Sequence, residues 1–134
     1  MSSIKINFSI ASENPLLLAN FYAQFNALEV SEGFGSSHFF ISLNNECKIQ
    51  FYKPSSKRSW PTKGSVTSLL FQKKPCKNTM LCLEQWMSAL ILLGAKVVEE
   101  PREEPFGSEV WMKDPEDNQF LILVPNNFAP HYFL

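Results

Sequence analysis

The chain has 134 residues and a mass of 15.3 kDa, which suits one compact domain or two small halves that share a core. Apolar residues make up 45% and charged residues 19%, which excludes disordered, collagen-like and low-complexity proteins. The net charge of −1 lacks the surplus of cations that non-specific nucleic-acid binding requires.

The sequence also predicts where the protein works. Its first residues lack the basic and apolar regions of a signal peptide, and its longest apolar stretch, residues 89–95, is far shorter than the roughly 20 residues that span a bilayer. Cys47, Cys76 and Cys82 form no CxxC pair and have no histidine nearby, so we expect three reduced thiols. We therefore expect a soluble cytoplasmic protein that binds neither nucleic acid nor membrane.

The first predicted element is a strand over residues 4–10, where four apolar residues alternate with three polar ones. A helix is expected from Leu16 to about Phe25, because Asn14 can cap its first turn and Pro15 suits its first position. We expect the strand and the helix to pack through the apolar stripes formed by Ile4, Ile6, Phe8 and Ile10 and by Leu17, Phe21 and Phe25.

Three short strands complete the first half, and the second half then repeats the same order of elements. The segment 54–64 is rich in turn formers and cations and is interpreted as the connector between the halves. The strands after the first are expected at Leu28–Glu32, His38–Leu43, Cys47–Tyr52, Val66–Gln72, Lys96–Glu99, Glu109–Lys113 and Asn118–Val124.

The second half also contains one predicted helix, over Thr79–Leu93, which Gly94 ends. A loop rich in Pro and Glu is expected over Glu100–Pro105, and a hairpin turn over Asp114–Asp117. The buried stripe of the helix is expected to consist of Cys82, Trp86, Leu90 and Leu93.

Several motifs resemble those of the vicinal oxygen chelate superfamily, which includes glyoxalase I, bleomycin-resistance proteins and extradiol dioxygenases. The most specific is the closing stretch from Asp114 to Phe120, which is similar to the family's DPDGN hairpin and follows a Trp at position 111. The resemblance covers residues 4–124. Its other motifs are Asn14-Pro15, Phe21-Tyr22, Leu93-Gly94-Ala95 and Pro105-Phe106-Gly107.

The resemblance implies an α+β fold in which two βαβββ modules form a curved, open mixed sheet, with the helices outside and a ligand cavity inside. It implies one glyoxalase-like domain over residues 1–134, with modules at about 4–53 and 65–124 and a tail at 125–134. We expect a homodimer whose ligand clefts lie at module or subunit interfaces. The apolar end of the tail, Phe128–Leu134, would seal the dimer or cover the cleft, or fray in solution.

Metal-dependent members of the family hold a divalent ion with four strand residues, which are His, Glu or sometimes Gln. Carried over one at a time, these positions fall on Asn7, near Gln50, within Thr62–Gln72 and on Leu121. None of these positions offers a charged ligand, and a dehydrated divalent ion needs anionic or strong nitrogen ligands. We therefore expect neither a metal nor another cofactor.

We expect the cavity to bind a small organic ligand, because amide and hydroxyl groups share it with apolar and aromatic walls. His38 is interpreted first as an ordinary residue at a strand end, and no catalytic residue is assigned. The candidate ligand-binding residues are Asn7, Ser9, Gln50, Tyr52, Trp60, Trp111 and Leu121.

Three functions remain open at this point. The first is a metal-independent small-molecule-binding protein of the glyoxalase/bleomycin-resistance type. The second is a glyoxalase-like lyase or isomerase that uses His38, Glu109 or a metal recruited through Gln50, and only the fold analogy supports it. The third is a structural or interaction module whose pocket has closed.

Overall fold

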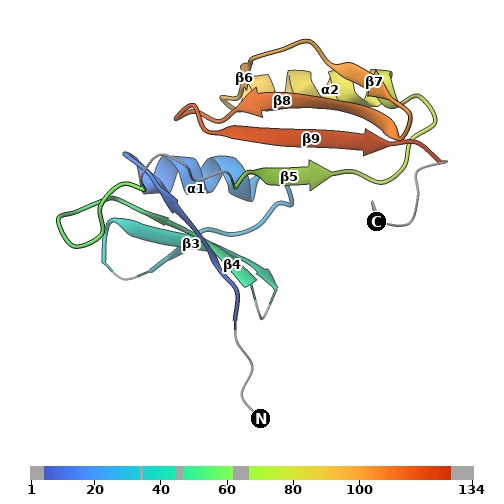
Figure 1. Ribbon diagram of the computed structural model, residues 1–134. Coiled ribbons are helices and arrows are strands. Elements are labelled where there is room, and N and C mark those ends of the chain that lie inside the picture. The colour runs from blue at the N-terminus through green and yellow to red at the C-terminus, as the bar shows by residue number, and fades with distance from the viewer. Residues whose placement is uncertain (1–4, 34, 45–46, 62–66, 128–134) are drawn as a thin grey trace. The chain divides into compact units, whose positions relative to one another are not determined.

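The structure is a computed structural model that describes residues 5–33, 35–44, 47–61 and 67–127 (Figure 1). Contacts divide the chain into two compact units, Met1–Ser65 and Val66–Leu134, each with its own helix and mixed sheet. The first unit has the βαβββ order, and the second repeats this order with one additional short strand. The predicted α+β class is confirmed. Neither helix of the described residues is long and apolar enough to cross a bilayer.

The first unit is a four-stranded sheet in the order β1-β4-β3-β2, with β1 parallel to β4 and the other neighbours antiparallel. One helix, α1, packs against strands β3 and β4. The chain passes through α1, β2 and β3 between β1 and β4, a connection long enough for these two neighbours to run parallel. The elements are β1 Phe8–Ala11, α1 Pro15–Ala23, β2 Ser31–Glu32, β3 His38–Asn44 and β4 Cys47–Tyr52.

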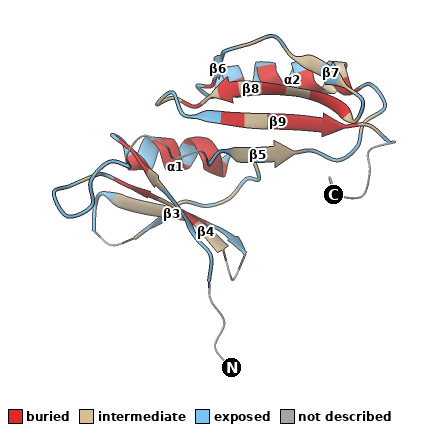
Figure 2. Ribbon diagram, viewed as in Figure 1, coloured by how far each residue is buried: buried red, intermediate tan, exposed pale blue. Residues whose placement is uncertain are grey.

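The core of the first unit lies between α1 and one face of its sheet (Figure 2). Leu18 and Tyr22 of the helix are buried there, together with Ile41, Ile49 and Phe51 of the strands. The rings of Tyr22 and Phe51 stack with their centroids 5.9 Å apart. Burying one such large side chain contributes about 2 kcal/mol, so this face holds the first unit together.

The predicted start of α1 is confirmed, whereas its predicted buried stripe is partly wrong. Asn14 caps the helix, and its Oδ1 accepts a hydrogen bond from the Leu17 N–H at 3.2 Å. Leu17 itself is 47% exposed and Leu18 is buried in its place. Three consecutive leucines fit more than one helical stripe, so the sequence pattern did not select the correct one.

The first strand is shorter than predicted, because β1 begins only at Phe8. Ile6 is 69% exposed, so its expected place in the core is wrong. Ile4, the tail residues 128–134 and part of the predicted connector lie outside the described residues.

The second unit orders its strands β5-β9-β8-β6, and β7 also pairs with β8. Strand β5 is parallel to β9, and the other pairs are antiparallel. Helix α2 packs against β8 and β9. The elements are β5 Leu69–Gln72, α2 Thr79–Leu92, β6 Lys96–Val97, β7 Arg102–Glu104, β8 Gly107–Lys113 and β9 Gln119–Pro125.

The buried stripe of α2 also differs from the predicted one. Leu83, Met87 and Leu90 are its buried apolar residues, whereas Leu93 is 42% exposed. Only Leu90 belongs to both stripes. The predicted helix end is confirmed, because Gly94 follows the last turn with φ +113° and its N–H bonds to the Ile91 carbonyl at 3.1 Å.

Two further expectations for the second unit are wrong. The predicted loop Glu100–Pro105 contains strand β7, whose register places Arg102 opposite Glu109. The expectation of three reduced thiols is also wrong, because Cys76 and Cys82 form a disulfide. Only Cys47, in the first unit, is a free thiol among the described residues, and it is half-buried. The pairing joins the segment before α2 to the first turn of the helix, two places that the N-cap at Asn78 brings together.

The predicted hairpin turn between β8 and β9 is confirmed and is built around Asp114, whose side chain is fully buried. One carboxylate oxygen accepts from the N–H groups of Glu116 at 2.8 Å and Asn118 at 3.0 Å. The other accepts from the side-chain amide of Asn118 at 2.9 Å. Asp117 has φ +69°, a conformation that Asp and Asn adopt more readily than most residues.

Replacing the buried carboxylate should therefore destabilise the protein. We expect Asp114→Ala to lower the free energy of unfolding by about 3 kcal/mol, because it leaves backbone N–H groups of the turn without acceptors. Urea denaturation followed by circular dichroism measures the loss. The matched control is Asp117→Asn, which keeps the turn and removes only an exposed ion pair with Lys96, so it should change the midpoint far less. Equal effects of the two substitutions would contradict this account.

Candidate functional site

The sheet face of the first unit that lies away from α1 carries most of the predicted polar site. Strand register places Ser9 of β1 and Phe40 of β3 on either side of Gln50. It also places His38 opposite Tyr52. Because strand residues alternate between faces, these five side chains share the face opposite the core residue Phe51.

An imidazole–amide hydrogen bond joins two neighbouring strands on this face. His38 Nε2 donates to Gln50 Oε1 at 2.8 Å, across β3 and β4. Gly33 approaches the His38 ring so closely that an added Cβ atom would overlap it. The Gly33 N–H also donates to the His38 carbonyl at 2.7 Å. The imidazole is therefore positioned by Gln50 on one side and by a glycine on the other.

Tyr52 joins the connector to this face. Its hydroxyl donates to the Ser59 carbonyl at 3.4 Å, and the Arg58 guanidinium lies 4.7 Å from the centre of its ring. The next residue, Trp60, is 47% exposed. The segment that carries Trp60 is thus attached beside Tyr52, as a loop that borders the polar face.

Asn7 is separated from the other predicted polar residues by its hydrogen bond. It precedes β1, and its Oδ1 accepts from the Lys48 N–H at 3.0 Å. The side chain therefore ties the start of β1 to β4. Ser9, one position inside the strand, is exposed and lies directly opposite Gln50.

The second unit presents its two predicted site residues together. Trp111 of β8 and Leu121 of β9 are directly opposite each other, and both are half-buried. By strand alternation they lie on the face opposite Val110, Phe120 and the helix. The face opposite the helix is therefore apolar where Trp111 and Leu121 meet.

A cluster of charged residues that the sequence did not predict borders Trp111. Arg102 binds Glu99 and Glu109, the latter with 2.6 Å between Nη2 and Oε2. Glu99 also accepts a hydrogen bond from the Trp111 backbone N–H at 2.7 Å. The hydrogen bond to Glu109, followed by that to Glu99, raises the pKa of Arg102 above its ordinary value. Glu109 is thus paired with a permanent cation.

The structure groups the predicted site residues by unit. Ser9, Gln50 and Tyr52 form one group, which His38 joins. From the sequence, His38 is interpreted first as an ordinary strand-end residue, and the pairing of β3 with β4 sets it opposite Tyr52. Arg102 could not have been identified from the sequence, because its pairing with Glu109 depends on strand β7, which has no apolar alternation to reveal it.

The predicted metal positions hold residues that do not fit a divalent-metal site. The amide oxygens of Asn7 and Gln50 each accept a hydrogen bond within the protein, and Leu121 has no donor atom. Residues 62–72 contain no His, Cys, Asp or Glu. Throughout the described ranges, no three such residues are grouped so that they could hold a metal.

The packing of Gly33 against the His38 ring can be tested by a measurement that does not depend on protein stability. We expect Gly33→Ala to fold with a small loss of stability, because the His38 ring is the far end of a side chain and can move. The moved ring should lose its bond to Gln50, which long-range ¹H–¹⁵N spectra of the imidazole would detect. Ser36→Ala, in the same loop, serves as the control and should leave these signals in place. Unchanged imidazole signals in Gly33→Ala would refute the packing role.

Comparison with known proteins identifies the fold. Searches of protein-family profiles and of curated proteins found no match. Among solved structures, a glyoxalase/bleomycin resistance protein/dioxygenase family enzyme from Burkholderia phytofirmans PsJN is 18% identical, with a TM-score of 0.69 over 89% of this chain and 96% of its own. An antibiotic-binding protein from a Streptomyces species is 15% identical, with a TM-score of 0.61 over 94% of this chain and 98% of its own.

A lactoylglutathione lyase from Agrobacterium tumefaciens is also similar, with 14% identity and a TM-score of 0.57 over 92% of this chain and 95% of its own. These structures agree in fold with the short motifs that resemble the vicinal oxygen chelate superfamily. At such low identity the likeness establishes the fold and leaves the function open. The chain therefore has the glyoxalase/bleomycin-resistance fold.

Proposed function

We propose that the protein binds a small, neutral or mildly polar organic molecule, with the polar face of the first sheet as its recognition surface. The observation that carries the proposal is the hydrogen bond between His38 and Gln50, which orders two polar side chains on an open sheet face. Holding such groups in place before binding lowers the entropic cost of recognising a ligand. The similarity to an antibiotic-binding protein supports this class of function.

The chemistry of the face indicates what kind of ligand it recognises. With its oxygen bound to His38, the Gln50 amide presents its N–H groups as donors, and the Ser9 hydroxyl lies on the neighbouring strand. Phe40, on the other side of Gln50, provides an apolar ring. A ligand with a carbonyl or hydroxyl group beside a flat apolar part matches this combination.

The binding is proposed to be independent of metal. Support comes from the neutral donors at the predicted strand positions, two of which already accept hydrogen bonds from Lys48 and His38. The carboxylate of Glu109, on the second unit's sheet, is bound to Arg102 and is not free to serve as a metal ligand. Moving it to a metal would break its hydrogen-bonded ion pair with Arg102.

We also propose that the protein forms a homodimer. Leu92, at the end of α2, is 88% exposed, and Val97 of β6 is 54% exposed. Apolar side chains of this size at the surface are stabilised when a second protein surface covers them.

Ligand screening tests the recognition surface directly. Titration of neutral aromatic amides and phenols should shift the backbone NMR signals of Ser9, His38 and Gln50, with saturable binding for at least one compound. Gln50→Leu should weaken that binding by about three- to tenfold, because it removes one hydrogen-bonding side chain and the bond that this side chain accepts from His38. Ser42→Ala, an exposed residue farther along β3, is the matched control. Binding that is equally strong in Gln50→Leu, or shifts confined to other residues, would reject the proposal.

Metal independence has its own test. Protein expressed in medium containing nickel, zinc, manganese and iron should retain far less than one ion per chain by mass spectrometry. Ligand affinity should be the same before and after treatment with a chelator, since no ion takes part in recognition. One bound ion per chain, lost in the Gln50→Leu variant, would overturn this part of the proposal.

A further inference from the structure

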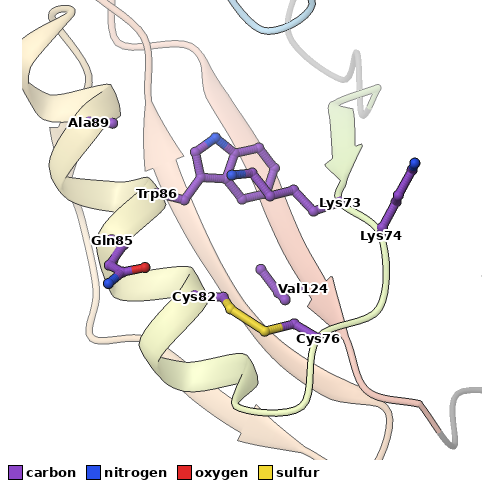
Figure 3. A pocket seen from close by; sticks show the side chains of 8 residues that line it. All are labelled: Lys73, Lys74, Cys76, Cys82, Gln85, Trp86, Ala89 and Val124. Atoms are coloured by element: carbon purple, nitrogen blue, oxygen red, sulfur yellow. A yellow bond between two sulfur atoms is a disulfide. The ribbon is translucent and has the colours of Figure 1, made fainter.

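A pocket lies within the second unit, on the side of its sheet that faces the helix (Figure 3). It has a volume of about 500 Å³ and is bounded by α2, the segment after β5 and the end of β9. Val124 of β9 lines it, and strand alternation sets Val124 on the face opposite Trp111 and Leu121. The pocket is therefore distinct from the surfaces discussed above, and its volume is within the usual range for small-ligand sites.

The residues around this α2 pocket carry positive charge beside a flat aromatic ring. Lys73 and Lys74 line it, and none of its described lining residues is acidic. The Lys73 ammonium lies 4.9 Å from the centre of the Trp86 ring, over its face. Gln85 adds an amide, and Ala89 and Val124 add apolar surface. Lysine attracts anions as a point charge, and an indole face accepts a flat apolar group.

The segment after β5, which carries Lys73, Lys74 and Cys76, is attached to the rest of the unit at three points. The Lys73 N–H donates to the Leu123 carbonyl at 3.1 Å, and the Cys76 N–H donates to the Pro125 carbonyl at 2.9 Å. The disulfide then joins Cys76 to Cys82 in the first turn of α2. Two of these attachments are to β9 and the third is to the helix, so the disulfide is a covalent link across the pocket.

We propose that the α2 pocket binds a small aromatic anion, with Lys73 facing its charge and Trp86 facing its ring, and that the Cys76–Cys82 disulfide keeps the pocket in its binding form. Lys74 also lines the pocket but its ammonium points away from the Trp86 ring (Figure 3), so it adds positive charge without facing the ligand directly. Reduction by a dithiol would open the pocket. One thiolate of the reductant attacks a cysteine sulfur and releases the other cysteine as a thiol. The second thiolate of the reductant then displaces the remaining cysteine, and the reductant leaves as a cyclic disulfide.

Calorimetry with two matched compounds tests the charge requirement in the full-length, oxidised protein. Naphthalene-2-carboxylate should bind about tenfold more tightly than the neutral naphthalene-2-carboxamide at low salt, since the ring is the same and only the charge differs. The double variant Lys73→Gln/Lys74→Gln should lose this preference. Lys77→Gln, which removes a charge from the same segment but not from the described pocket lining, should keep it. Titration with 2-naphthyl phosphate distinguishes a carboxylate site from a phosphate site.

The role of the disulfide is tested with the same carboxylate. Its affinity should fall at least threefold after reduction with dithiothreitol and to the same extent in Cys76→Ser/Cys82→Ser, provided that circular dichroism shows both forms folded. Equal affinity of the carboxylate and the amide, or no effect of the lysine substitutions, would overturn the site. Unchanged affinity after reduction would overturn the role of the disulfide. Gln50→Leu should leave this binding unchanged, which separates the outcome from that of the first-sheet proposal.

Discussion

The burial of one sheet face beneath one helix is the constraint on which each unit depends. Phe51 in the first unit and Phe120 in the second are fully buried on that face. A shift of the register by one residue would expose them and bury their polar neighbours, so the pairing of the strands is strongly determined. The same constraint assigns every alternate residue to the other face. Gln50 and Leu121 occupy their positions because the residue next to each of them is needed in the core.

The features that could be predicted from the sequence are those that depend on a few adjacent residues. The Asn14 cap, the glycine after α2 and the turn around Asp114 each use local backbone chemistry that a short motif specifies. Strand alternation also placed Ser9, Gln50 and Tyr52 on one face, and the strand register agrees with this. These features do not require knowledge of what lies farther away in the chain.

The features that were mispredicted depend on tertiary contacts. Leu18 rather than Leu17 is buried because the sheet selects one of several apolar stripes that the helix offers. Strand β7 has the polar sequence Arg-Glu-Glu and exists because its backbone pairs with β8. The Cys76–Cys82 disulfide depends on how the chain enters α2, which cysteine spacing does not reveal. Of the site, the polar residues were therefore predictable, whereas their bonding partners were not.

The two units show how a repeated scaffold can carry different chemistry. In both, the helix-covered face supplies most of the apolar burial, so substitutions on the other face cost little stability provided that they remain paired or exposed. The first unit carries an imidazole–amide pair on that face, and the second carries an arginine paired with Glu99, Glu104 and Glu109. An imidazole and an amide exchange hydrogen bonds with a neutral ligand at little cost, whereas the arginine would have to leave its carboxylates first. The polar face of the first unit is for this reason better suited to the recognition that we propose, and the charged cluster of the second is better suited to fixing the strand that carries Trp111.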